Sequence, residues 1–242
     1  MLKRTGWSWR KVTPVAACVV LLLATCGPLA GCGLGPRTRV LFIGNSYTSF
    51  NGGLDQQLAR MDRSIEAASV APGGYRLEDH WNDPKTLSAL QGGKWDYVVL
   101  QEQSQTPVVD QAKFDEYAGR FDAEIRKGGA ETVLLMTWER PDSVVYGVTT
   151  QNVGNAYHYL GAQLGVKVAP AGLAFALALQ EQPDLALYSQ DGHPTVEGTY
   201  LAACVLYGTL LGKSPLGLSY SPGLSEQEKR ILQGIAAKTL GY

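Results

Sequence analysis

Histidine and cysteine are scarce in this sequence, which narrows the chemistry that it can support. The 242 residues include three histidines and four cysteines. Three of the cysteines lie within the first 32 residues, so Cys204 is alone in the rest of the chain. A single cysteine can form neither a disulfide framework nor a cysteine-rich zinc site. The HExxH, Walker and GxGxxG motifs of zinc proteases, phosphate-binding loops and dinucleotide-binding folds are also missing.

Excess positive charge and long apolar runs are missing as well. The chain has 21 basic and 22 acidic residues, and residues 1–32 hold four basic and no acidic ones, so 17 basic and 22 acidic residues remain beyond them. A mildly acidic domain gives no support for nucleic-acid binding. The two most apolar stretches, 12–23 and 171–179, are shorter than the ~20 residues that a transmembrane helix needs.

The N-terminal 32 residues have the order of an export signal. Four basic residues precede the apolar stretch 12–23, and Leu29-Ala30-Gly31-Cys32 follows it. The last four residues resemble the lipobox of bacterial lipoproteins, which implies cleavage before Cys32 and a lipid on its sulfur. The protein would then be anchored to a membrane of the bacterial cell envelope through Cys32. The alternative is an ordinary secretory signal and a secreted protein.

The remainder of the chain alternates between strand and helix patterns. Residues 33–38 form a short Gly/Pro tether, and residues 39–242 predict a single domain. Short apolar runs predict strands, and periodic apolar positions between them predict helices. This alternation favours an α/β fold, a three-layer α/β/α sandwich with a central parallel sheet. The predicted strands span residues 40–43, 64–70, 97–100, 132–137 and 166–168.

An early serine and a late Asp/His pair predict a nucleophilic hydrolase. The run Val40–Ile43 stops at Gly44-Asn45-Ser46, which puts Ser46 at the carboxyl end of a strand, where open α/β sheets bind ligands. Asp191 and His193 precede a helix predicted to begin at residue 195. Such a serine, base and acid are the parts of a catalytic triad. The alternative is that Asn45, Ser46 and Thr48 merely cap the next helix.

These motifs resemble those of the SGNH (GDSL-like) hydrolase superfamily, and in particular its subgroup with a GNS first motif. The stretches 73–81, 95–104 and 198–204 fit the same subgroup. The resemblance implies that Ser46 attacks an ester, that His193 moves the proton and that Asp191 holds the imidazole. It also implies an oxyanion hole formed by the backbone N–H groups of Ser46 and Gly74. The expected mechanism requires no metal and no cofactor.

Two departures from the superfamily pattern concern this site. The Gly-x-Asn-Asp block is absent, and Gln101-Glu102-Gln103-Ser104 stands in its place, so Gln101 and Gln103 are the candidates for the missing oxyanion donor. The usual Asp-x-x-His block has Gln190 at its first position, with Asp191 only two residues before His193. Either Asp191 reaches the ring through a shifted turn, or Gln190 or a backbone carbonyl orients it.

His80 is the rival histidine. It has two acidic neighbours but lies on a polar segment with a helical pattern, where a packing role, or one supporting the site from behind, is expected.

The expected function is a serine esterase, in its sharper form a carbohydrate O-acetylesterase acting on acetylated glycans at the cell envelope. Three tryptophans, Trp81, Trp95 and Trp138, together with several tyrosines could line a sugar site. The rival hypothesis is a non-catalytic lipoprotein of the same fold that binds a glycan or an envelope partner. The acyl group, the leaving alcohol and the oligomeric state are left open.

Overall fold

A five-stranded, wholly parallel sheet lies at the centre of the domain. The computed structural model describes residues 1, 2, 6 and 37–242, so Cys32 and nearly all of the predicted signal and tether lie outside the described residues. The strand order is β2-β1-β3-β4-β5. The predicted α/β fold with a parallel sheet is confirmed. The strands are β1 (Thr38–Ile43), β2 (Ile65–Val70), β3 (Tyr97–Leu100), β4 (Glu131–Leu135) and β5 (Lys167–Ala169).

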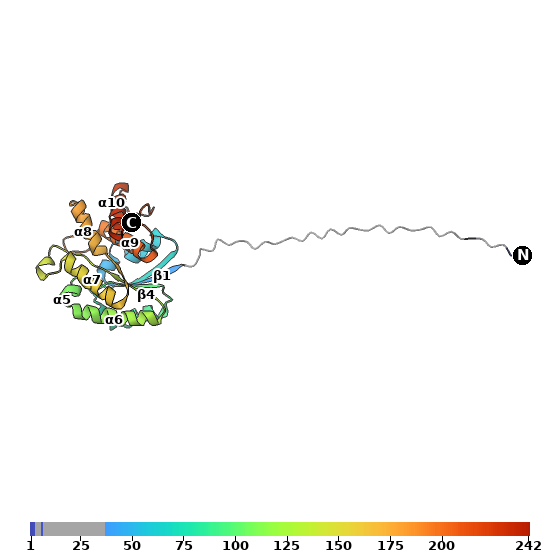
Figure 1. Ribbon diagram of the computed structural model, residues 1–242, viewed down its shortest axis with the longest axis horizontal. Coiled ribbons are helices and arrows are strands. Elements are labelled where there is room, and N and C mark those ends of the chain that lie inside the picture. The colour runs from blue at the N-terminus through green and yellow to red at the C-terminus, as the bar shows by residue number, and fades with distance from the viewer. Residues whose placement is uncertain (3–5, 7–36) are drawn as a thin grey trace. The chain divides into compact units, whose positions relative to one another are not determined.

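Helices cover both faces of this sheet, and Figure 1 shows α8, α9 and α10 on one side and α6 on the other. The α-helices are α1 (Ser46–Ser49), α2 (Leu54–Met61), α3 (Leu77–Trp81), α4 (Pro84–Gly92), α5 (Thr106–Val109), α6 (Gln111–Lys127), α7 (Thr150–Leu164), α8 (Ala171–Glu181), α9 (Val196–Leu211) and α10 (Glu226–Leu240). Two short 3₁₀ helices are η1 (Phe50–Gly52) and η2 (Val144–Tyr146).

The alternation of side chains along β1 builds two separate cores. Val40 and Phe42 pack with residues of α2, α8, α9 and α10, whereas Leu41 and Ile43 pack with residues of α4, α6 and α7. Successive residues of a strand point to opposite faces of the sheet. Because both faces are covered, the strand is continuously apolar, as expected for a buried parallel strand.

Helix α9 is buried on nearly all sides. Cys204 on this helix is fully buried, and burial raises the pKa of its thiol. Ala171, Ala174 and Phe175 are buried on α8, so the apolar stretch 171–179 is a core helix. Within the described part of the chain, no helix is both long enough and apolar enough to cross a bilayer.

The parallel arrangement brings the loops after the strands to one edge of the sheet. The turn after β1 is tied to both neighbouring strands: Gly44 N–H donates to the Val70 carbonyl at 3.1 Å, and Gln101 N–H donates to the Ile43 carbonyl at 2.9 Å. The segment before α9 reaches the same edge, because Asn51 donates to the Pro194 carbonyl at 2.8 Å. The residues that the sequence singles out for catalysis therefore share one edge.

Candidate active site

The turn that carries Ser46 is tightly specified by its neighbours. Ser46 is the first residue of α1, and Asn45 caps this helix by accepting the Tyr47 N–H at 3.1 Å. A Cβ at Gly44 would lie 2.3 Å from Thr48 Oγ1 and 2.6 Å from Gln101 Oε1, so the position requires glycine. The capping role falls to Asn45, and the Ser46 side chain lines a cavity.

A continuous chain of hydrogen bonds joins Ser46, His193 and Asp191. His193 Nε2 lies 2.9 Å from Ser46 Oγ, and His193 Nδ1 lies 2.9 Å from Asp191 Oδ2. The carboxylate accepts a hydrogen bond from Nδ1–H, so the ring proton is on Nδ1 and Nε2 is the acceptor for the serine hydroxyl. This is the tautomer in which a histidine can act as a general base toward the serine.

A tight turn carries Asp191 back to the histidine ring. Gly192 has a positive φ of 81°, a conformation that glycine adopts without strain. Asp191 Oδ1 accepts the Ser189 hydroxyl at 2.6 Å and the His193 N–H at 3.2 Å. These hydrogen bonds, with that from Ser189 the largest cause, lower the pKa of the Asp191 carboxyl. Of the alternatives left open above, the structure therefore shows the shifted turn.

Gly74 lines the same cavity as Ser46. Its φ is +76°, and Asn45 Nδ2 ties the adjacent loop to the nucleophile turn by donating to the Tyr75 carbonyl at 2.9 Å. Among the loop and cap hydrogen bonds of the described residues, neither the Ser46 nor the Gly74 N–H has a carbonyl partner. Both backbone donors are thus available to a ligand.

The cavity between these loops has a volume of about 480 Å³. Phe50 stacks on the His193 ring with the centroids 4.1 Å apart. Asn51, at a φ of 53°, donates to both Pro194 O and Thr199 Oγ1 at 2.8 Å, which ties the loop after Ser46 to the residue after His193. The lining residues are Asn45, Ser46, Tyr47, Phe50, Gly73, Gly74, Gln103, Ser104, Arg140 and His193.

Comparison with solved structures places this geometry among known folds. A Slackia heliotrinireducens protein described as a candidate SGNH hydrolase is 29% identical, with a TM-score of 0.64 over 72% of this chain and 99% of that one. The chain belongs to the SGNH hydrolase superfamily.

Two structures of lower sequence identity have a similar fold. A DUF4886 family protein from Bacteroides uniformis is 19% identical, with a TM-score of 0.71 over 85% of this chain and 95% of that one. A lipase/acylhydrolase from Enterococcus faecalis is 17% identical, with a TM-score of 0.55 over 73% of this chain and 96% of that one. No protein-family model matches the chain, and no curated protein matches it either.

In place of the Asn-Asp block this SGNH chain has Gln101 and Gln103, and their side-chain amides have different hydrogen-bond partners. Gln101 Oε1 accepts from the Asn45 N–H and the Thr48 hydroxyl, and Gln101 Nε2 donates to Asn45 Oδ1 at 3.0 Å and to the Glu102 carbonyl at 2.6 Å. Both amide hydrogens are therefore occupied. The prediction that Gln101 donates to an oxyanion is wrong, because this buried side chain braces the nucleophile turn instead.

Gln103 is the candidate that remains. Its Oε1 accepts the Gln105 N–H at 2.8 Å, which fixes the amide. Its Nε2 has no hydrogen bond within the described part of the chain, and the residue lines the cavity. An amide anchored at its oxygen and free at its nitrogen is suited to donate to a developing negative charge.

Glu102, between the two glutamines, was missed as a site residue. It is 1% exposed and accepts the N–H groups of Gln103 at 2.6 Å and Leu77 at 3.3 Å. It thereby joins the loop after β3 to the start of α3, close to the Gly73-Gly74 loop. Burial raises the pKa of Glu102 to about 7. The available signal was a carboxylate two residues after the end of a buried strand.

His80 supports the nucleophile turn from the core side. It is fully buried, with Nε2 2.7 Å from the Gly44 carbonyl and Nδ1 2.9 Å from the Thr86 hydroxyl. A carbonyl can only accept, so Nε2 carries the proton and Nδ1 accepts from Thr86. Burial lowers the pKa of His80, which keeps the ring neutral. Its contacts are those of a positioning residue, and it does not touch Ser46.

The expectation of a tryptophan-lined sugar site is not met. None of the three tryptophans lines the cavity that contains Ser46. Trp138 is 2% exposed and is stacked between Tyr47 and Phe175, at centroid distances of 4.4 and 4.2 Å. Core packing explains this residue, and the aromatic wall of the cavity comes from Tyr47 and Phe50.

Across residues 37–242, no group of three or more His, Cys, Asp and Glu side chains is arranged to hold a metal ion.

Proposed function

We propose that this chain is a serine ester hydrolase with Ser46 as its nucleophile. The observation that carries the proposal is the hydrogen-bonded series from Ser46 Oγ to His193 to Asp191, with both ring nitrogens at 2.9 Å from their partners. Membership of the SGNH superfamily supports hydrolysis of ester bonds. The roles assigned below follow from this geometry.

The proposed reaction proceeds in two steps. Ser46 Oγ attacks the acyl carbon while His193 Nε2 takes the hydroxyl proton, and the protonated ring then donates that proton to the leaving alcohol. Water next attacks the acyl-serine with His193 again as the base, which releases the acid and restores Ser46. Asp191 holds the ring and stabilises its charged form.

The oxyanion formed in each step would meet three donors. These are the backbone N–H groups of Ser46 and Gly74 and the Nε2 of Gln103. One such donor is worth about 3 kcal/mol of transition-state stabilisation. A Gln103→Leu substitution should therefore lower kcat by about 10²-fold while changing KM little.

The finer form of the proposal is a carbohydrate O-acetylesterase anchored at the bacterial cell envelope. It is supported by the predicted export signal and lipobox at Cys32 and by the mixed polar and aromatic lining of the cavity. Acetylated glycans and p-nitrophenyl acetate are the substrates to screen first.

The decisive experiment is covalent labelling of the full-length chain in detergent by a fluorophosphonate probe. Labelling should be lost in Ser46→Ala and in His193→Ala. Ser49→Ala is the matched control, because Ser49 lies exposed at the other end of α1 and its loss should leave labelling intact. Folded protein that does not label would overturn the esterase proposal.

A second candidate function is a non-catalytic SGNH-fold protein that binds a glycan or an envelope partner. The missing Asn-Asp block and the 66% exposed side chain of Asp191 favour it, because solvent weakens the hold of that carboxylate on the imidazole. Such a protein would not label with the probe, and Ser46→Ala would leave its ligand affinity unchanged.

A further inference from the structure

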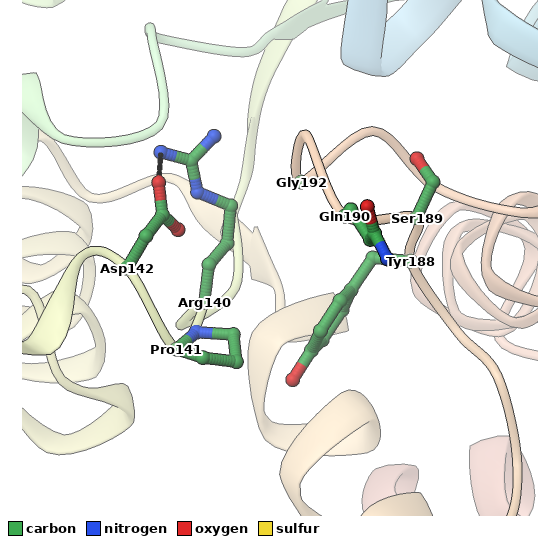
Figure 2. A pocket seen from close by; sticks show the side chains of 7 residues that line it. All are labelled: Arg140, Pro141, Asp142, Tyr188, Ser189, Gln190 and Gly192. Atoms are coloured by element: carbon green, nitrogen blue, oxygen red, sulfur yellow. Dashed lines mark hydrogen bonds and ion pairs between the residues drawn. The ribbon is translucent and has the colours of Figure 1, made fainter.

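Arg140 stands at the boundary between the catalytic cavity and a second cavity of about 380 Å³. It belongs to the segment that follows β4. Figure 2 shows its side chain and that of Asp142 on one side of the second cavity, with Tyr188, Gln190 and Gly192 on the other. Among the lining residues that the structure describes, Arg140 alone is common to both cavities. A group bound at Ser46 can therefore extend toward its guanidinium.

The charges that line the catalytic cavity favour an anion. Arg140 is the only lysine or arginine among its lining residues, and no aspartate or glutamate is among them. The Asp191 carboxylate is engaged by the His193 ring and by Ser189. A positive charge in a partly enclosed space interacts more strongly with a ligand charge than it would in water.

The hydrogen-bonding capacity of Arg140 is poorly used. Its Nη1 donates to the Tyr47 hydroxyl and to the Asp191 carbonyl, both at 3.4 Å, near the limit for a hydrogen bond. Its Nε is buried and has no hydrogen-bond partner within the described residues. Buried polar groups normally have partners, so an unsatisfied donor of this kind calls for an explanation.

Arg140 forms an ion pair with Asp142 that a bound ligand could replace. Nη2 lies 3.1 Å from Asp142 Oδ2, and the side chains are 14% and 62% exposed respectively. Pairs with an exposed partner contribute little to stability. A carboxylate on a bound ligand could compete with Asp142 for the guanidinium, because arginine binds carboxylates with two parallel hydrogen bonds.

We propose that Arg140 is a specificity-determining residue that binds a carboxylate carried by the ester substrate. The inference rests on the proposed esterase function and narrows its substrate class to esters with an acidic group near the scissile bond. The carboxylate lies against the guanidinium at the junction of the two cavities, and the part of the substrate that bears it extends into the space shown in Figure 2.

A purely structural role for Arg140 makes a different prediction. A Cβ at Gly192 would lie 2.2 Å from Arg140 Cδ, so the side chain packs closely on the turn that carries His193. If Arg140 only holds this turn, its loss lowers the hydrolysis of neutral and anionic esters by the same factor. The ratio of the two rates separates the two roles.

The test uses 3-acetoxybenzoate and its methyl ester, which release the same acyl group and differ in one charge. We expect Arg140→Gln to lower the ratio of kcat/KM for the anionic ester to kcat/KM for the neutral ester by about tenfold or more. Arg120→Gln is the matched control, since Arg120 lies on α6 paired with Glu116 and lines neither cavity. It should leave the ratio unchanged.

Asp142→Asn tests the same idea in the opposite direction. Removing this competing carboxylate should raise the ratio several-fold, because Nη2 is released and a like charge disappears. An unchanged ratio in Arg140→Gln, or a lowered ratio in Asp142→Asn, would overturn the inference while the esterase function stands. If Ser46 does not label and neither ester is hydrolysed, the esterase proposal fails and this inference fails with it.

Discussion

Two histidines contact the turn that carries Ser46, and of these two only His193 is hydrogen-bonded to the serine hydroxyl. His80 reaches the Gly44 carbonyl from the core and is fully buried, whereas His193 reaches the Ser46 hydroxyl from the cavity with a 27% exposed side chain. Burial lowers the pKa of His80, and no carboxylate within residues 37–242 is hydrogen-bonded to its ring. His193 has Asp191 at Nδ1 to stabilise a charged ring. The two imidazoles therefore differ in burial and in hydrogen-bond partners, and this difference is why the proposed mechanism gives the role of base to His193.

The largest effect is expected at His193. His193→Ala should lower kcat/KM for an activated ester by at least about 10³-fold, because the base that takes the Ser46 proton is lost. Its melting temperature should stay close to that of wild type, since the ring contacts the cavity rather than the core. Steady-state kinetics with thermal unfolding as the control measures both. A smaller loss of activity than that caused by His80→Ala would reverse the assignment of the two histidines.

Asp191→Asn should have the next largest effect. An asparagine oxygen can still accept, but its amide can equally present a donor to Nδ1, which stabilises the wrong tautomer of His193. We expect kcat to fall by about 10²- to 10⁴-fold with KM little changed. Gln190→Ala is the control, because Gln190 lies exposed beside the second cavity, and it should retain activity. Equal losses in the two variants would mean that the turn, and not the carboxylate, matters.

His80→Ala should act mainly on stability. The substitution removes a fully buried side chain and two hydrogen bonds, to Gly44 and Thr86, which should lower the free energy of unfolding by about 2–4 kcal/mol. Denaturant unfolding measures the loss. His80→Gln should restore part of it, since its amide can donate to the Gly44 carbonyl. A stability loss below that of an exposed substitution would contradict a role in holding the turn.

The smallest effect concerns Glu102 and appears in the pH dependence of stability. Its pKa is raised by burial from 4.5 to about 7 in the folded state, so folding favours the protonated carboxyl. The contribution of the Glu102 carboxyl to the free energy of unfolding is largest below about pH 4.5. It decreases as the pH rises toward 7 and does not change further above about pH 7. Glu102→Gln should remove about 2–3 kcal/mol of this decline. Urea unfolding at pH 5 and pH 8 provides the comparison; a decline as steep as in wild type would refute the assignment.

The two glutamines after β3, Gln101 and Gln103, show why the local sequence pattern could not identify the oxyanion donor. They stand two residues apart in one polar segment, and either could have aimed an amide at the cavity. The side-chain amide of Gln101 is hydrogen-bonded to Asn45 and Thr48, which lie more than fifty positions away in the chain. Which donors remain free is set by these long-range partners, and no spacing rule within the segment encodes them.

Arg140 and Glu102 are two residues that sequence reasoning did not single out and that the tertiary structure places at the site. Arg140 belongs to no recognised motif, and Glu102 lies in the 95–104 stretch without a role that the motif assigns to it. Both stand near acidic or polar neighbours that would be unremarkable on a surface. Arg140 becomes notable only because the turn carrying His193 folds against it. Glu102 becomes notable only because the start of α3 lies over it.

By itself the sequence determined the alternation of strands and helices, the parallel sheet and the position of Ser46 at a strand end. It did so because hydrophobic periodicity and turn residues act over a few neighbouring positions. The tertiary structure alone decided that Asp191 reaches His193, that His193 reaches Ser46 across 147 positions, and that Gln101 is occupied while Gln103 is free. Those outcomes depend on distances between segments, which are set by how the helices pack on the sheet.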